Sequence, residues 1–168
     1  MHFLPPAKLQ SIDSGALDEL LARTGIVVAA GAGEVRGLAA AALLFADYAV
    51  LDAGATLHIE APQAWAAATW RIGRKALLLH IRQQTILPAA DAKAEGLCDE
   101  IIEGDAHAWL DRWMQGRSTL ALDSAATLIR MRGGDALERA EFARLFAIGE
   151  PQRGLEAFLT RSSRSPKT

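Results

Sequence analysis

Residues 26–50 read IVVAAGAGEVRGLAAAALLFADYAV, and this stretch decides which fold the chain can adopt. Ile26 to Ala30 is apolar and rich in β-branched residues without polar alternation, which is typical of a strand buried on both faces. The strand runs into a turn of the form Gly31-x-Gly33-x-x-x-Gly37, and an Ala/Leu-rich helix follows over 38–46. The predicted order is therefore a buried strand, a glycine-rich turn and a buried helix.

Outward from this stretch, the chain combines short strands with longer helical segments. Short strands are expected at 1–4, 47–51, 56–59 and 100–103. The spacing of apolar residues predicts a helix from Ser14 and a largely helical chain after residue 62, with segments at 64–72, 74–82, 89–95, 106–115, 118–132, 136–148 and 153–160. We interpret residues 1–168 as one domain, with a core at 1–104, a helical C-terminal part at 105–160 and a flexible tail at 161–168.

Composition excludes several classes of function. The 18 Lys and Arg residues face 20 Asp and Glu residues, and the formal net charge of -2 supports neither nucleic-acid binding nor a polybasic membrane patch. The longest apolar run, residues 38–45, is far shorter than the roughly 20 residues of a membrane-spanning helix. The N-terminal residues lack the pattern of a signal peptide. We therefore expect a soluble cytoplasmic protein with no membrane partner.

Cysteine and histidine residues give no sign of metal or redox chemistry. Cys98 is the only cysteine, which excludes an internal disulfide and a thiolate metal cluster. Its apolar Leu-Cys-Asp context, with no adjacent histidine, predicts a buried and inert thiol. His80 and His107 have no partners at the spacing of metal ligands, so no metal site is assigned.

The glycine turn by itself has other interpretations. A buried strand that enters such a turn before a helix resembles a nucleotide-binding turn, in which backbone N–H groups and a helix N-terminus meet a pyrophosphate. Asp52, after the next strand, lies where a carboxylate would hold a ribose hydroxyl. A dinucleotide-binding fold would continue with βαβ units, however, whereas this sequence becomes almost entirely helical after Ile59. Spacing alone also allows the glycines to serve only close packing of strand and helix.

Four segments resemble the crotonase (enoyl-CoA hydratase/isomerase) superfamily. Residues 26–50 resemble its core motif, in which an apolar strand leads through a glycine loop into a helix that closes in "CD" or "AD". Residues 72–79, IGRKALLL, are similar to its "VG…A…LLLTG" helix, and residues 86–102, ILPAADAKAEGLCDEII, resemble "ISAEEALEWGLVDEVV". Residues 153–159, RGLEAFL, resemble the terminal "EGxxAFLEKR". The four segments occur in the order that the family has.

The resemblance implies an α/β fold of the ClpP/crotonase type, a spiral of β-β-α turns shortened at the N-terminus and followed by a helical oligomerisation region. It also implies an acyl-CoA or acyl-carrier thioester as ligand, with no other cofactor. The family's chemistry runs through a thioester oxyanion held by two backbone N–H groups, one of them at the start of the helix after the glycine loop. Matched residue by residue, this donor falls at Leu38, just after Gly37, and Gly33 falls at the substrate.

The sequence departs from the family at its acid–base positions. The two glutamates that activate water in hydratases fall at Ala41 and Ala61, and alanine cannot move a proton. A slip of one residue would bring Glu60 to the second position, with His58 two residues away on the same strand face. Glu60 and His58 are therefore the candidate catalytic residues. An exposed strand-end carboxylate and a packed histidine are the alternatives left open.

Two further departures concern the ends of the ligand site. Family members have a longer segment ahead of the core motif, with a loop that gives the second oxyanion donor and much of the adenine pocket. Trp65 and Trp70 stand where the family tends to have small residues, and we expect them in the core or in an interface. Arg164 and Lys167 in the tail could meet the phosphates of CoA, and a solvated terminus is the alternative.

Three functions therefore remain open. The first is a crotonase-like protein that binds a thioester or acts on it, as an isomerase, decarboxylase or hydratase with a relocated acid such as Glu60. The second is a catalytically inactive homologue that serves as an assembly or scaffold subunit, as a homotrimer or higher oligomer or together with a longer crotonase partner. The third is a nucleotide-binding domain.

Overall fold

A computed structural model of the chain describes residues 1–83, 86–131 and 135–162. They cluster into two compact units. The core unit comprises residues 2–23 and 27–110, and the C-terminal unit comprises Met1, residues 24–26 and the chain from Asp111 onward. The interpretation of residues 1–168 as one domain stays a prediction.

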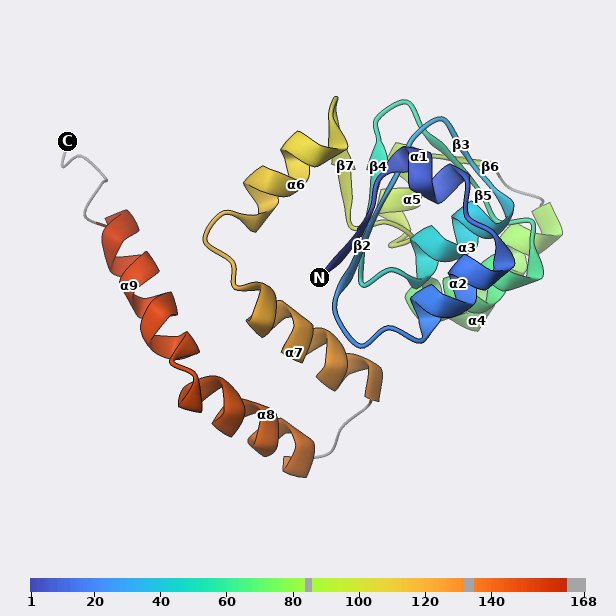
Figure 1. The fold of residues 1–168 in the computed structure, drawn as a ribbon. Helices are drawn as coiled ribbons and strands as arrows, with labels where there is room; N and C mark the ends of the chain where they lie inside the picture. Colours follow the sequence, from blue (N-terminus) through green and yellow to red (C-terminus); the bar gives the residue numbers. More distant parts are fainter. Residues whose placement is uncertain (84–85, 132–134, 163–168) are drawn as a thin grey trace. The chain divides into compact units, whose positions relative to one another are not determined.

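The core unit consists of short strands and helices that follow one another along the chain (Figure 1). Its strands are β1 (His2–Leu4), β2 (Val27–Gly31), β3 (Glu34–Val35), β4 (Tyr48–Asp52), β5 (Thr56–His58), β6 (Ile86–Pro88) and β7 (Glu100–Ile102). Its helices are α1 (Pro6–Gln10), α2 (Ser14–Leu21), α3 (Gly37–Phe45), α4 (Pro62–Gln83), α5 (Ala89–Ala94) and the first half of α6 (Ala106–Met114).

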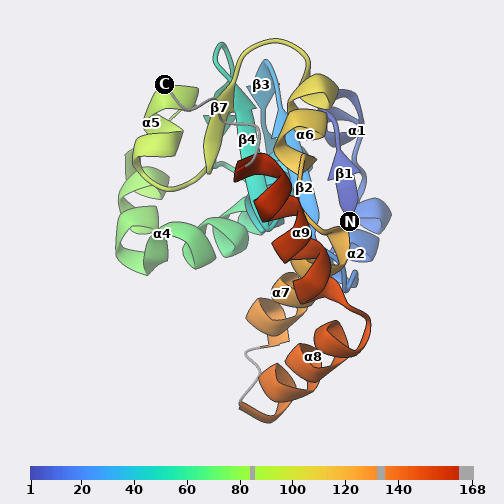
Figure 2. The same ribbon diagram turned by 90° about the vertical axis from the view of Figure 1, so that its left-hand side faces the viewer.

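Two sheets organise the core unit. The first is parallel throughout, in the order β1-β2-β4-β7, and Figure 2 shows its strands side by side. In the second sheet, β3 is parallel to β5, and β6 is antiparallel to β5. Twice along the chain, a strand of the first sheet is followed by a strand of the second and then by a helix, as β2-β3-α3 and as β4-β5-α4. This repeat confirms the predicted α/β fold of β-β-α turns.

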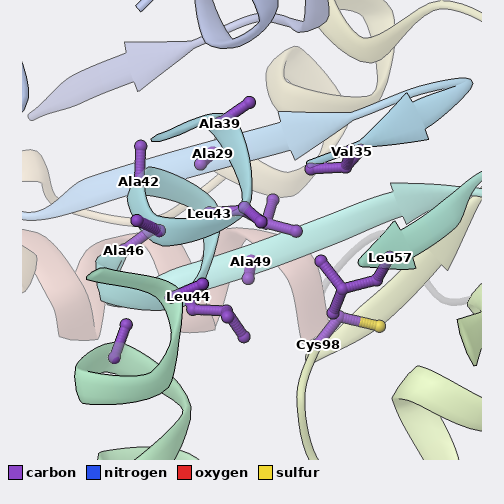
Figure 3. Close-up of a cluster of buried hydrophobic side chains, with 14 of the residues drawn as sticks. Ala29, Val35, Ala39, Ala42, Leu43, Leu44, Ala46, Ala49, Leu57 and Cys98 are labelled. Carbon is purple, nitrogen blue, oxygen red and sulfur yellow. The ribbon is translucent and has the colours of Figure 1, made fainter. Parts of the chain in front are cut away.

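The middle of the core is the packing of α3 against β2 and α4. All five residues of β2 are buried, and so are residues 39–44 of α3. Alanine is the best helix former and needs little space, so α3 can approach its neighbours closely. Figure 3 shows Leu43 and Leu44 of α3 among Ala29, Ala49 and Leu57. Complete burial of one leucine contributes roughly 1.5–3 kcal/mol, so this helix anchors the unit and holds its own N-terminus in place.

Most predicted elements are present, with ends within a few residues of those expected. The helices predicted at 64–72 and 74–82 are confirmed as the two halves of α4, which meet at a kink at Gly73, where φ is 78°. Three elements lie outside the sequence predictions: α1, β3 and β6. Each of them has five residues or fewer, which is too short for a helical or strand period to show in sequence.

The C-terminal unit is helical, as predicted. It contains α7 (Thr119–Met131), α8 (Asp135–Ala147) and α9 (Glu150–Ser162). Asp123 of α7 ties the unit to its own short segment 24–26, because its carboxylate accepts a hydrogen bond from the Ile26 N–H at 2.8 Å. No described helix is both long enough and apolar enough to cross a membrane.

Candidate functional site

The glycine turn between β2 and α3 has a backbone that requires its glycines. Gly33 and Gly37 have φ of 63° and 57°, in the left-handed region that other residues rarely adopt. Gly31 has a different role, because a Cβ there would lie 2.7 Å from Val35 Cγ2 and 2.9 Å from Leu51 Cδ2. The turn therefore has a closely packed glycine at Gly31 and two glycines with positive φ, Gly33 within the turn and Gly37 at the first residue of α3.

The backbone N–H groups at the start of α3 differ in their hydrogen bonds. The N–H groups of Ala39 and Ala40 bond to the Arg36 carbonyl at 3.1 and 3.3 Å. For the N–H groups of Gly37 and Leu38, the described residues offer no acceptor. Unpaired donors at a helix N-terminus, together with the helix dipole, favour negative charge on a bound oxygen. The structure thus keeps Gly37 and Leu38 at a position that suits an oxyanion.

Gln10 holds the other end of the turn. This residue is the last of α1, and its side-chain Nε2 donates to the carbonyls of Ala32 at 3.0 Å and Glu34 at 2.9 Å. These two carbonyls flank Gly33. The sequence gives no sign of this contact, because α1 is too short to be predicted and the partners are 22 and 24 positions away.

Glu60 is held close to the turn by Arg36. The Arg36 Nε lies 3.0 Å from Glu60 Oε1, and the Arg36 Nη1 lies 3.8 Å from Glu34 Oε2. All three side chains are at least half exposed, so this ion pair contributes at most about 1 kcal/mol to stability. The ion pair matters for geometry instead. It links Arg36, which directly precedes Gly37, to Glu60 in the segment after β5.

His58 has a separate partner. Its Nε2 lies 3.3 Å from the Thr56 hydroxyl on the same strand. Among the described residues, no hydrogen bond or ion pair links His58 to Glu60. The structure therefore brings Glu60 to the glycine turn and leaves His58 paired within β5.

The two alanines that the resemblance places at acid–base positions both pack against the core. Ala41 is fully buried in α3, and Ala61 packs partly buried against the same cluster. Trp65 also packs there, and its Nε1 donates to the Ile59 carbonyl at 3.0 Å, which confirms a core role. Trp70 is 70% exposed, so it is not a core residue.

Other candidate residues lie apart from the turn. Burial, and then the neighbouring Asp99, raise the pKa of the Cys98 thiol to about 11, in keeping with the prediction of a buried, inert thiol. The His80 Nε2 pairs with the Glu95 carboxylate. Arg164 and Lys167, predicted to bind substrate, lie outside the described residues, as does most of the predicted flexible tail at 161–168. In the described part of the chain, no three His, Cys, Asp or Glu side chains gather as a metal site would require.

A polar cavity of about 240 Å³ lies in the C-terminal unit. Its charged groups are already paired, since Arg144 Nη2 donates to Glu141 at 2.8 Å and to the Ser124 hydroxyl at 2.6 Å. Hydrogen bonds from Arg144 and Ser124 lower the pKa of Glu141. The hydrogen-bonding groups of Arg144, Glu141 and Ser124 in this cavity are therefore already bonded to one another.

The nucleotide-binding interpretation finds no support in this geometry. Two strands, not one, precede each helix of the repeat, and they belong to different sheets. Asp52 accepts a hydrogen bond from Gly54 N–H at 3.0 Å and closes its own turn. Gly33 and Gly37 therefore belong to a β-β-α turn, and Asp52, the last residue of β4, caps the turn that follows that strand.

The β-β-α repeat and the glycine turn before α3 define a class: the chain has the fold of the crotonase, or enoyl-CoA hydratase/isomerase, structures. It resembles a putative enoyl-CoA hydratase/isomerase family protein from Hyphomonas neptunium, with a TM-score of 0.71 and 23% identity over 92% of this chain and 65% of that one. It resembles DspI from Pseudomonas aeruginosa with a TM-score of 0.68 and 22% identity over 91% of this chain and 64% of that one.

A third similar structure is the enoyl-CoA hydratase/isomerase from Cupriavidus metallidurans, with a TM-score of 0.68 and 20% identity over 88% of this chain and 62% of that one. The chain thus spans less than two thirds of the length of these proteins. No protein-family model matches the sequence, and no curated protein matches it. The likeness at these identities shows the fold and leaves the activity to be argued from the site.

Proposed function

We propose that the chain binds an acyl thioester, of coenzyme A or of an acyl-carrier protein, at the start of α3. The observation that carries this proposal is the pair of N–H groups at Gly37 and Leu38, for which the described residues offer no acceptor. A thioester carbonyl at Leu38 would accept this hydrogen bond and be stabilised as negative charge develops on its oxygen. The fold supports this ligand class, since proteins described as enoyl-CoA hydratases or isomerases share it.

Glu60 is the acid–base residue of this proposal. Arg36 holds its carboxylate at the turn, and Arg36 directly precedes Gly37. A carboxylate there would move a proton at a carbon near the thioester carbonyl, as an isomerase or a hydratase requires. His58 is the second candidate. Gly33 would lie beside the ligand, and Arg164 and Lys167 would meet the phosphates of CoA.

The second candidate function is that of a catalytically silent assembly subunit. Ala41 and Ala61 favour it, because neither can move a proton. The C-terminal unit also exposes apolar side chains on its helices, among them Phe142 of α8 and Leu155 and Leu159 of α9. A homotrimer, a higher oligomer or a longer crotonase partner would cover such faces.

Thermal unfolding in the presence of ligands tests the thioester proposal. Acetyl-CoA or a medium-chain enoyl-CoA at 100 times its Kd should stabilise the fold by about 2.7 kcal/mol, which raises Tm by several degrees. Leu38→Pro removes the N–H donor at a helix position where proline is tolerated, and it should lose most of this shift. Leu38→Ala is the matched control, because it shortens the side chain and keeps the N–H.

The comparison of variants separates the two candidate functions. Stabilisation of the wild type and of Leu38→Ala, but not of Leu38→Pro, supports a thioester at this donor. If CoA, acetyl-CoA and the enoyl-CoA leave the Tm of the wild type unchanged up to millimolar concentration, the thioester proposal fails and the assembly subunit is the better account. Assays of hydration and isomerisation with the wild type then show whether the bound thioester reacts. Loss of that activity in Glu60→Gln would assign the proton transfer to Glu60.

A further inference from the structure

The Gln10 side chain of α1 makes two hydrogen bonds to the backbone of the glycine turn. Its two partners, at 3.0 and 2.9 Å, are both carbonyl oxygens, so the group that faces them must be the NH2 and not the amide oxygen. Both N–H bonds of the amide are therefore used. The residue itself is exposed, so its amide gives up contact with water to bond the turn.

Three successive carbonyls of the turn accept hydrogen bonds from residues outside it. Gln10 bonds those of Ala32 and Glu34, and the N–H of Thr56 in β5 bonds that of Gly33 at 2.9 Å. Gly33 alone would leave this segment many conformations, because glycine can adopt both signs of φ. The three bonds select one of them.

The backbone conformation that these bonds fix at residues 32–34 affects the direction of the Leu38 N–H. From Glu34 the chain passes through Val35, which is fully buried, and then Arg36 to Gly37 and Leu38. The pairing of Val35 with Leu57 of β5 holds the middle of this segment, so only Arg36 and Gly37 lie between the paired strand and the Leu38 N–H. A donor stabilises developing charge most when it is already aimed before the ligand arrives.

We propose that Gln10 is a positioning residue for the oxyanion donor, which makes the short helix α1 part of the thioester site. This inference rests on the proposed function. Gln10 contacts no substrate itself, since both its donors are spent on the turn. It acts by fixing the backbone that presents the Leu38 N–H to the thioester carbonyl.

The test compares binding of acetyl-CoA with binding of CoA, which has no thioester carbonyl. Gln10→Met keeps the length of the side chain and removes both donors, and Gln10→Asn keeps the amide but is too short to reach both carbonyls. Each should bind acetyl-CoA roughly tenfold more weakly than the wild type, while binding of CoA stays within about twofold. Lys8→Met, on the exposed side of the same helix, is the matched control and should bind both ligands like the wild type.

A second readout follows the bound carbonyl directly. In wild-type protein saturated with acetyl-CoA labelled with ¹³C at the thioester carbon, the infrared carbonyl band should move to lower frequency than in water. In both Gln10 variants at saturation this shift should fall by half or more. A general loss of structure would weaken both ligands in parallel and lower Tm, so selective loss of acetyl-CoA affinity identifies positioning.

The affinities and the carbonyl band distinguish failure of the positioning role of Gln10 from failure of the proposed thioester site. If the wild type shifts the carbonyl band and both variants shift it equally, Gln10 does not position the donor, and the thioester site stands. Equal weakening of CoA and acetyl-CoA also overturns the inference, because it assigns Gln10 to the fold alone. A wild type that neither binds acetyl-CoA nor shifts its carbonyl band overturns the proposed function and this inference together.

Discussion

Cys98 illustrates how burial of one residue links to the stability of the whole fold. The thiol is 3% exposed, and burial raises its pKa from the ordinary 9.0 to about 11. Between these two values the thiol of the unfolded chain ionises while the folded thiol stays protonated. Ionisation thus favours the unfolded state. The contribution of the protonated Cys98 thiol to the free energy of unfolding is therefore fully present below about pH 9 and is lost as the pH rises towards 11.

We therefore expect Cys98→Ala to unfold with a weaker dependence on pH than the wild type. Urea unfolding of both proteins at pH 8 and at pH 10.5 measures this, because the difference between them cancels the other titrating groups. The wild type should be the more stable at pH 8, by about 1 kcal/mol for the lost packing, and this advantage should shrink at pH 10.5. An advantage that is equal at both pH values would contradict a raised pKa.

Residue by residue, the sequence predicted the backbone of the candidate site better than its side-chain contacts. The resemblance to the crotonase motif placed the donor at Gly37 and Leu38, and the left-handed φ of 57° at Gly37 agrees with the glycine that this motif has there. The pairs Gln10 with Glu34 and Arg36 with Glu60 do not follow from the sequence. Each joins residues 24 positions apart that only the stacking of α1, β3 and β5 brings together. The periodicity of apolar residues within one helix or strand cannot predict contacts between residues so far apart in the sequence.

At the scale of elements, Arg71 of α4 joins that helix to the end of α3. Its Nε and Nη2 donate to the carbonyls of Leu44 at 2.8 Å and Ala46 at 2.7 Å, and its Nη1 lies 3.2 Å from the Asp99 carboxylate. The side chain is only 11% exposed. A cation at the C-terminus of a helix also stabilises the helix dipole.

Arg71→Met should therefore lower the free energy of unfolding by about 3 kcal/mol, since it leaves two buried carbonyls and one carboxylate without their charged donor. Urea unfolding at neutral pH measures the change. The exposed Arg74 on the same helix gives the control, and Arg74→Met should cost less than about 0.5 kcal/mol. Equal effects of the two substitutions would show that the network around Arg71 does not hold α3 and α4 together.

The elements that the sequence predicts most clearly are those that are most deeply buried in the core. The run 26–30 gave β2, and the Ala/Leu segment after Gly37 gave α3, because burial on all sides requires continuous apolar sequence. The break in α4 at Gly73 was predicted as the boundary between two helices, because glycine readily adopts the positive φ that interrupts a helix. Strand β3 has two residues and is defined by its partner β5 alone.

At the scale of the whole molecule, the helices of the C-terminal unit expose several large apolar side chains. On α8, Phe142 and Phe146 are one turn apart, with ring centroids 4.5 Å from each other, and both are exposed. On α9, Leu155 and Leu159 share one face at the same spacing, and both are more than half exposed. Large contiguous apolar patches on a folded chain mark surfaces that another chain covers.

We expect the protein to be an oligomer in solution, with these faces in the contact. Light scattering after size-exclusion chromatography should give a mass of about 54 kDa for a trimer of the 18.0 kDa chain. Leu155→Glu and Leu159→Glu place a charge in the contact and should shift the mass towards that of a single chain. Gln152→Glu adds the same charge at an exposed polar position of α9 and should leave the mass unchanged. A wild-type mass of 18 kDa would remove the assembly function in its homo-oligomeric form, and the apolar faces would then require a different partner chain.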